Sequence, residues 1–491
     1  MNKLRHLLLS VWAYLLFTAA AWGQTHSYTL EDIIQLARSK SPAWFSAETR
    51  KENQYWQYRT YRSDYNPQLV LSGMLPSFNK SVIPVTQPDG NVIYREVNNN
   101  TLQMQLGLSQ VIGPTGGTIS VFTDLSRYDD FIQDYSQYSG TPVSIGLIQP
   151  IFQFNPYKWN RKIKPLVYEE SQKKYFEELE QISINATRRF FDLLLAQINL
   201  EIARKNVESN DTIYQIALGR YNLGKITEND LLQLELNLVN SKLAVSQALV
   251  DQQTAALNLK SFIGLSDDDS INLVLPEKIP DFEVDENVAL AEARKNKSDI
   301  VSFRRRQLEA QQELERAKRT SGVNMNLTAF YGLTNQGQNI DNVYTDPANA
   351  LRVGLQMNVP ILDWGRQKAR KMTAEANLKL VNYQLLQDEA NFDQEVLTQV
   401  RNFNMLREQL KARIKSDEIA DKAYEISKQL FLIGKISITD LNAAMISKDQ
   451  AKQRYVSTLR DFWLAYYQLR EKTLYDFANN QLLVRDIVQG K

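Results

Sequence analysis

The chain has 491 residues, a formal net charge of +1, no cysteine and two histidines. The lack of cysteine excludes disulfide bonds, a thiolate nucleophile and cysteine-ligated metals. With only His6 and His26, the usual base near neutral pH and the commonest metal ligand are almost missing. A net charge near zero is also not that of an electrostatic nucleic-acid binder. We therefore predict a protein that is not an enzyme, binds no nucleic acid and holds no metal or cofactor.

The first 23 residues have the pattern of a signal peptide. Lys3 and Arg5 precede the apolar stretch LLLSVWAYLLFTAAA, and Ala21-Trp22-Gly23 is a small-x-small cleavage signal. We predict that residues 1–23 are removed on export. After them no apolar run is long enough to cross a bilayer as a helix. A membrane-embedded form would therefore have to be a closed β-barrel, because lipid satisfies no open sheet edge.

Several segments alternate apolar and polar residues with a period of two. In the first half they are 66–74, 145–152 and a hairpin of 102–111 and 118–126 joined by IGPTGG; in the second half they are 323–332 and 351–362. Residues 76–100 are rich in Pro and Asn, and we expect them to form a loop. Strands of about ten residues with one apolar face are typical of transmembrane barrels. Alternation alone favours a soluble β-sandwich, and the extra hairpin either enlarges a barrel or forms an external loop.

Two long helices are predicted over 158–221 and 366–431, where Pro165 is the only proline. At ~1.5 Å per residue each would be a rod of roughly 100 Å. Narrow apolar stripes spaced three and four apart predict coiled-coil-like packing. The stripe positions are Phe191, Leu194, Ile198, Ile202, then Leu231, Leu234, Leu238, Ser241, Val245, Ala248, and in the second half Val396, Val400, Phe403, Leu406, Leu410 and Ile414.

Each long helix ends in the same short motif. YNLGKITENDL occupies 221–231, and FLIGKISITDL occupies 431–441. Gly224 and Gly434 are well placed to adopt positive φ where the chain reverses direction. Asp230 and Asp440 come early in the returning helices, where a carboxylate is favoured by the helix N-terminus. We predict two helical-hairpin tips, and a capped turn without further role is the alternative interpretation.

The matched motifs belong to a longer internal repeat. TLEDIIQLARSKSP at 29–42 resembles DENVALAEARKNKSD at 285–299, and Pro150 in QPIF corresponds to Pro360 in VPIL. A period this long indicates a duplicated half of a domain. We predict a first repeat over 24–265 with its tip at 221–226, and a second over 287–476 with its tip at 431–436. A linker at 266–286 joins them, and 477–491 form a C-terminal tail.

Taken together, the paired motifs, the Ser41-Pro42 helix start and the QPIF and VPIL strand ends make the chain resemble the TolC family of outer-membrane efflux proteins. The resemblance implies an α+β membrane protein that is a homotrimer in the outer membrane. Each subunit would give about four strands to one shared barrel and two helical hairpins to a long helical barrel through the periplasm.

The resemblance also implies a function and its partners. The chain would be the passive exit duct of a tripartite efflux or type I secretion system, opened at its tips by a periplasmic adaptor and an inner-membrane pump. By position, the adaptor-docking tips are Leu223, Gly224, Lys225, Ile433, Gly434 and Lys435. The residues around the periplasmic aperture are Tyr221, Asp230, Phe431 and Asp440.

One departure from the family affects how the aperture closes. A tyrosine and an arginine that form part of a polar lock in the family correspond here to Phe431 and Ile436. We hypothesise that Phe431 closes the aperture by apolar contact instead. The competing function is that of a structural envelope protein that uses its coiled coils as a spacer and never conducts.

Overall fold

The computed structural model describes residues 26–265 and 271–484. The expected signal peptide, part of the linker and the end of the tail lie outside these residues. The chain divides into two units, which are described separately. One, here the helical unit, comprises Met1–Lys51, Gln172–Ser298 and Glu389–Lys491, and the other, here the sheet unit, comprises Glu52–Ser171 and Asp299–Asp388.

Long helices dominate the chain, and two of them match the predicted rods. Both α4 and α9 have 67 residues, so each is about 100 Å long. Pro165 is tolerated in the third turn of α4. Within the described residues, none of the helices is both long enough and apolar enough to span a lipid bilayer. The helices are α2 (Leu30–Lys40), α3 (Pro42–Ser63), α4 (Pro156–Asn222), α5 (Glu228–Ile263), α6 (Glu286–Asn296), α7 (Ser298–Thr320), α8 (Ile340–Tyr344), α9 (Arg366–Leu432) and α10 (Ile438–Thr473).

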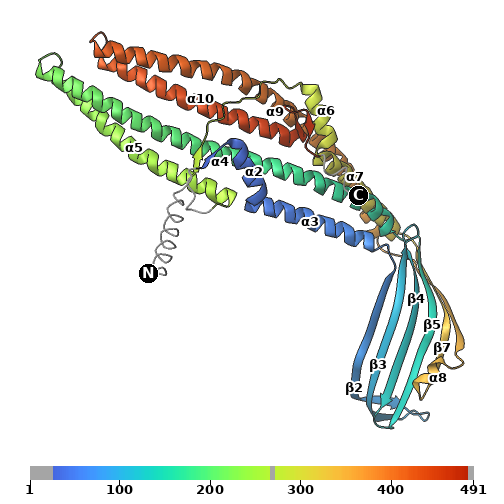
Figure 1. The fold of residues 1–491 in the computed structure, drawn as a ribbon. Helices are drawn as coiled ribbons and strands as arrows, with labels where there is room; N and C mark the ends of the chain where they lie inside the picture. The colour runs from blue at the N-terminus through green and yellow to red at the C-terminus, as the bar shows by residue number, and fades with distance from the viewer. Residues whose placement is uncertain (1–25, 266–270, 485–491) are drawn as a thin grey trace, which may run out of the picture. The chain divides into compact units, whose positions relative to one another are not determined.

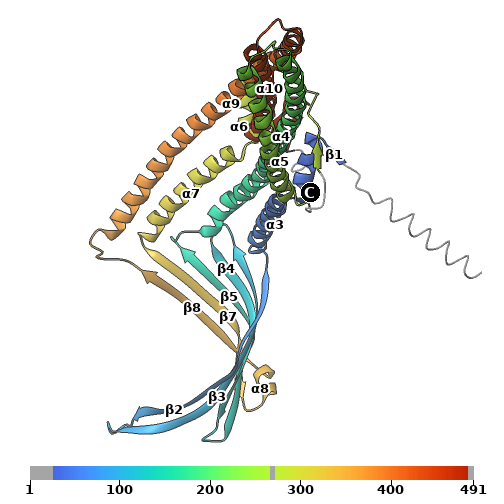
Figure 2. The same ribbon diagram turned by 90° about the vertical axis from the view of Figure 1, so that its left-hand side faces the viewer.

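The helical unit is built from two helical hairpins whose apolar stripes pack together. α5 runs back beside α4, and α10 runs back beside α9 (Figures 1 and 2). Phe191, Val400 and Phe403 are fully buried, so the predicted stripes form the core. Rings from both helices of the second hairpin meet there, with the Phe403 and Phe462 centroids 5.4 Å apart. The stripe prediction is wrong for Ile414, which is 41% exposed.

The sheet unit contains a six-stranded antiparallel sheet in the order β2-β3-β4-β5-β7-β8. The expected number of about four strands is therefore wrong. The predicted hairpin lies inside the sheet as β3 and β4, where Ile112 pairs with Gly117. The strands are β2 (Gln68–Thr86), β3 (Val92–Ile112), β4 (Gly117–Asp130), β5 (Tyr135–Ile151), β7 (Asn324–Gly337) and β8 (Ala348–Asn358).

The loop expected at 76–100 is instead the extension of the β2–β3 hairpin. Ser77 pairs with Thr101 at one end of this extension, and Thr86 pairs with Val92 at the other. Proline removes a ladder donor, so it is confined mainly to edge strands. β2 is an edge strand, and it therefore accommodates Pro76 and Pro84.

One face of the sheet carries an exposed apolar row that runs from edge to edge. The residues in the row are directly paired across neighbouring strands, so their side chains share a face. Their exposed fractions range from 40% to 72%. In strand order they are Leu69, Leu108, Val121, Ile145, Tyr331 and Leu351. Figures 1 and 2 together show these strands side by side.

The described part of the linker packs within the helical unit. Its short strand β6 (Ile271–Leu273) pairs in parallel with β1 (His26–Tyr28). Val284 is buried, and the Asn404 side chain on α9 hydrogen-bonds both its N–H and its carbonyl. After α10, the two-residue strands β9 (Tyr475–Asp476) and β10 (Gln481–Leu482) form an antiparallel pair.

Candidate functional site

The two hairpin tips have the same backbone geometry. Gly224 and Gly434 have φ values of 69° and 76°, which confirms the predicted positive φ. Gly224 N–H donates to the Tyr221 carbonyl at 2.8 Å, and Lys225 N–H donates to the Arg220 carbonyl at 2.9 Å. In the second tip, Gly434 N–H donates to the Phe431 carbonyl and Lys435 N–H donates to the Leu430 carbonyl, both at 2.9 Å. This pattern is a Schellman motif, which satisfies the last carbonyls of a helix and requires a residue in the left-handed region.

Each returning helix begins with a capping box. The Thr227 hydroxyl donates to Asp230 Oδ2 at 2.7 Å and accepts from the Asp230 N–H at 3.2 Å. Ser437 and Asp440 make the same pair of bonds at 2.7 and 3.2 Å. The Ser437 hydroxyl, together with the Ser437 N–H, lowers the pKa of Asp440. Both aspartates therefore do what their position near a helix N-terminus predicts, because each caps the first turn of its helix.

The tips of the two hairpins share one apolar core. Phe431, Ile436 and Ile226 are partly buried against it. Its buried members are Ile213, Ala217, Leu234, Tyr424, Ile438 and Leu441. Because they come from all four hairpin helices, the tips are held together within one subunit.

Arg220 connects the hairpins in a way that sequence reasoning missed. Its guanidinium donates to the Leu432 carbonyl at 2.5 Å and to the Phe431 carbonyl at 3.4 Å. It also lies 5.8 Å from the centroid of the Phe431 ring. These carbonyls end α9, where the helix dipole favours a cation. The sequence contained one sign of this role: Arg220 breaks the match between the two repeats, because the corresponding position of the second repeat is an apolar residue, Leu430.

The predicted aperture residues differ in how they are buried and bonded. Tyr221 is 38% exposed, whereas Phe431 packs against the shared core. Asp230 and Asp440 lie at the starts of their helices with their carboxylates engaged in capping. The structure thus brings Phe431 into contact with the first hairpin through Arg220 and through the shared apolar core.

The predicted docking residues form two matched exposed turns. Leu223 is 71% exposed and Ile433 is 64% exposed, each directly before its glycine. Lys225 and Lys435 follow the glycines and are exposed as well. Each tip therefore presents a strongly exposed apolar side chain two positions before a lysine.

A polar layer lies farther from the tips. The Tyr424 hydroxyl is 3.0 Å from Ser209 Oγ, and Asn206 donates to Asp449 Oδ2 at 2.7 Å. Asp449 Oδ1 has no hydrogen-bond partner within the described residues, and Lys448 Nζ is 3.9 Å away. Burial raises the pKa of Asp449. These contacts again join the first hairpin to the second.

Comparisons with known proteins agree with this architecture. The Outer membrane efflux protein family model matches residues 118–265 and 289–472. The alkaline protease secretion protein AprF of Pseudomonas aeruginosa is 23% identical over 395 residues, which is 77% of this chain and 78% of AprF.

Solved structures share the fold across nearly the whole chain. The CmeC outer membrane channel of Campylobacter jejuni has a TM-score of 0.67 at 16% identity, covering 96% of this chain and 93% of that one. The outer membrane protein VceC of Vibrio cholerae has a TM-score of 0.62 at 14% identity, covering 91% and 95%.

Paired helical hairpins and an antiparallel sheet make up the fold that this chain shares with these solved structures. The chain belongs to the outer membrane efflux protein family, which is the TolC family that the motifs indicated. It is accordingly a transport protein of the outer membrane that extends into the periplasm, from a family of channels rather than of enzymes.

Proposed function

We propose that three copies of this chain form a passive exit duct. The six-stranded sheets would join edge to edge into one barrel in the outer membrane, and the hairpins would form a helical barrel in the periplasm. Two features support this assembly: the edges β2 and β8 are unpaired in one chain, and a lipid-embedded sheet needs every edge satisfied. The apolar row across the sheet supplies a surface for lipid. The two repeats, 24–265 and 287–476, would each contribute one hairpin.

The single observation that carries the proposal is the matched pair of hairpin tips. Each repeat ends its long helix at a positive-φ glycine and starts the next helix with a capping box. The turn between them exposes an apolar residue before the glycine and a lysine after it. We propose that the exposed residues dock a periplasmic adaptor attached to an inner-membrane pump. They are Leu223, Gly224, Lys225, Ile433, Gly434 and Lys435.

We further propose that the periplasmic aperture lies beside these tips and involves Tyr221, Asp230, Phe431 and Asp440. Since Phe431 and Ile436 replace the lock residues of the family, closure would depend on the shared apolar core and on Arg220. Opening would then separate the second hairpin from the first. The partner supplies the driving force, and this chain performs no chemical step.

The relatives suggest two classes of cargo for this duct. AprF is named for the secretion of an alkaline protease, so a secreted protein is one cargo to test. A small molecule exported by an efflux pump is the other.

Planar-bilayer recording of the detergent-extracted protein, together with its measured mass, tests the duct. We expect a trimeric mass and discrete conductance steps. A monomer without conductance would instead favour the non-conducting spacer.

The same recordings test the apolar closure. We expect Phe431→Ala to raise the single-channel conductance severalfold, because it removes a ring that packs in the shared core. Leu223→Ala, at an exposed tip position, is the matched control and should leave conductance unchanged. Equal conductance in wild type and Phe431→Ala would exclude this residue from the closure.

A further inference from the structure

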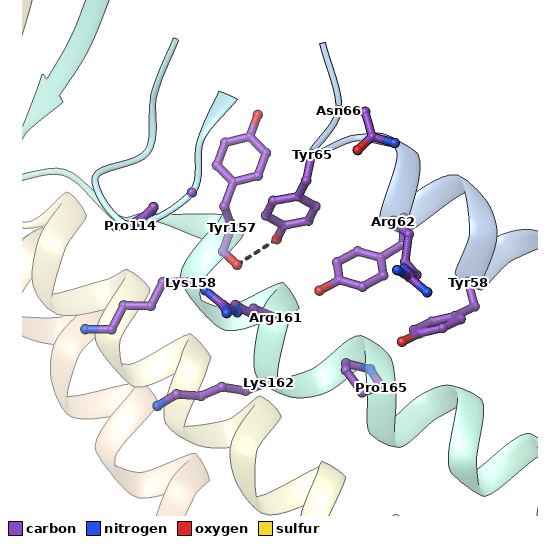
Figure 3. Close-up of a pocket in the computed structure, with 12 residues that line it drawn as sticks. Tyr58, Arg62, Tyr65, Asn66, Pro114, Tyr157, Lys158, Arg161, Lys162 and Pro165 are labelled. Atoms are coloured by element: carbon purple, nitrogen blue, oxygen red, sulfur yellow. Dashed lines mark hydrogen bonds between the residues drawn. The ribbon is translucent and has the colours of Figure 1, made fainter. Parts of the chain in front are cut away.

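The sheet unit contains a cavity of about 1180 Å³ that the duct proposal does not use. Three segments line it: the end of α3, the start of α4 and the turn between β3 and β4 (Figure 3). In the figure Tyr65, Tyr157 and Arg161 lie together, while Tyr58 and Arg62 line the α3 side.

Hydrogen bonds hold the three walls in place. Asn155 Nδ2 donates to the carbonyls of Gly113 and Pro114 at 3.0 Å each, and Asn155 Oδ1 caps α4 by accepting from Tyr157 N–H at 3.0 Å. The Tyr65 hydroxyl donates to the Tyr157 carbonyl at 2.8 Å. One asparagine and one tyrosine thus join the turn and both helices, so the cavity has a defined shape.

The charges around the cavity are all positive. Arg62 comes from α3, whereas Lys158, Arg161 and Lys162 share one face of the first turns of α4. No carboxylate lines the cavity, and none of the four cations makes an ion pair within the described residues. Some other arginines of this unit are paired: Arg305 contacts Glu170, and Arg306 contacts Asp388. The four cations therefore form an uncompensated positive surface.

Aromatic rings form the rest of the wall. The successive centroid distances from Tyr58 to Tyr61, Tyr65 and Tyr157 are 5.8, 5.3 and 5.9 Å. All four tyrosines are half-buried. Tyrosines with an apolar ring and a polar tip are enriched where a membrane meets water.

The position of the cavity in the sheet unit indicates what meets it. Tyr65 is three residues before β2 begins, and Tyr157 follows the end of β5. The cavity therefore lies at the end of the sheet near Leu69, which is the first member of the apolar row. Basic pockets beside apolar membrane surface are suited to lipid phosphate groups.

We propose that this cavity binds the phosphate group of an anionic ligand. Arg62 and Arg161 act from opposite helices, and the tyrosines cover the adjoining apolar part of the ligand. A glycerophospholipid headgroup and free inorganic phosphate both carry this group, and the apolar row beside the cavity favours the lipid. The proposal does not depend on conduction by the protein.

The test uses the full-length protein, extracted and delipidated in detergent. Phosphatidylglycerol binding is titrated by native mass spectrometry for wild type and for Arg62→Gln/Arg161→Gln. Neither arginine has an ion-pair partner within the described residues, so folding is expected to survive the change. The matched control is Arg59→Gln/Lys164→Gln, which removes one exposed cation from each of the same helices outside the cavity.

We expect affinity to fall about fivefold for each cavity cation removed, while the control binds like wild type. Inorganic phosphate is added as a competitor. Failure of phosphate to displace the lipid supports a lipid site, whereas displacement that requires Arg62 and Arg161 supports a free-phosphate site. Equal lipid binding by wild type and the double variant overturns the proposal. Bilayer conductance of the same double variant reports on the duct separately.

Discussion

At the scale of single residues, the tip region depends on side chains that join the two hairpins. Arg220 is the main one, because it places a cation on the last carbonyls of α9 and beside the Phe431 ring. Hydrogen bonds from a charged donor are stronger than those between neutral groups. Arg220 lies outside the recognisable motif, yet it links the end of α9 to the first hairpin.

We predict that Arg220→Ala lowers the free energy of unfolding by about 1 kcal/mol and raises the open probability of the channel. The carbonyls of Phe431 and Leu432 would lose their charged donor. Circular-dichroism melting and bilayer recording measure the two effects. Arg204→Ala changes an exposed arginine of the same helix and is the control. A variant that matched Arg204→Ala in both measurements would remove Arg220 from the tip contacts.

Asp449 gives a pH-dependent prediction. Burial raises the pKa of its carboxyl above the ordinary value of 3.8, so the folded state favours the protonated form. The stabilisation is complete below pH 3.8 and is lost as the pH rises through the raised pKa, because the buried carboxylate must then ionise. At neutral pH the ionised group is therefore a cost to folding.

Asp449→Asn should accordingly raise the free energy of unfolding by about 1 kcal/mol at pH 7 and have little effect below pH 4. In the variant, the Asn206 amide can still donate to a side-chain oxygen at position 449. Melting temperatures across pH measure the difference, and Asp421→Asn is an exposed control on α9. A gain that was the same at every pH would contradict the raised pKa.

At the scale of elements, the hairpin turns depend on two glycines for conformational rather than packing reasons. A Cβ added at Gly224 or Gly434 would meet nothing within 4 Å, so only the positive φ opposes a side chain. A non-glycine residue in the left-handed region costs about 1 kcal/mol. The turns therefore require glycine even though they are open to solvent.

We predict that Gly224→Ala and Gly434→Ala each destabilise the protein by about 1 kcal/mol. Gly219→Ala is the matched control, since Gly219 lies in α4, also has open space around it and has no positive φ. That change should stabilise the protein by about 0.5 kcal/mol through the higher helix propensity of alanine. Chemical denaturation measures all three, and three equal effects would show that φ is not the cause.

At the scale of the whole molecule, the apolar row of the sheet has to be covered. Leu108, Val121 and Ile145 are directly paired and 40–51% exposed on one face. In the proposed trimer this row faces lipid, whereas residues one position away face the lumen. The two faces should therefore tolerate charge very differently.

Val121→Lys should destabilise the membrane-embedded protein by roughly 1–4 kcal/mol, because it places a charge on the lipid face. Gln103→Lys on the other face of the neighbouring strand should have little effect. Folding into lipid vesicles, followed by heat-modified gel mobility, measures both. Equal tolerance of lysine at the two positions would argue against a lipid-facing row.

Local patterns in the sequence determined much of this protein. Gly224, Asp230 and their partners in the second repeat follow rules that involve only neighbours in the chain, so the tips were predictable. The period of two identified all six strand regions, including the hairpin at 102–126, and the three-four spacing identified both long helices. The error in strand number came from the family resemblance rather than from the pattern.

Only the tertiary structure decided which segments and side chains meet. Residues 76–100 were expected to form a loop because they are rich in Pro and Asn. Most of them instead extend β2 and β3, since β2 lies at an edge where a missing N–H is tolerated. Arg220 reaches Leu432, and Arg62 and Arg161 line one cavity, across distances in the chain that no periodicity spans. A local sequence pattern reflects only residues that are near one another in the chain, whereas contacts between distant residues depend on how separate helices pack.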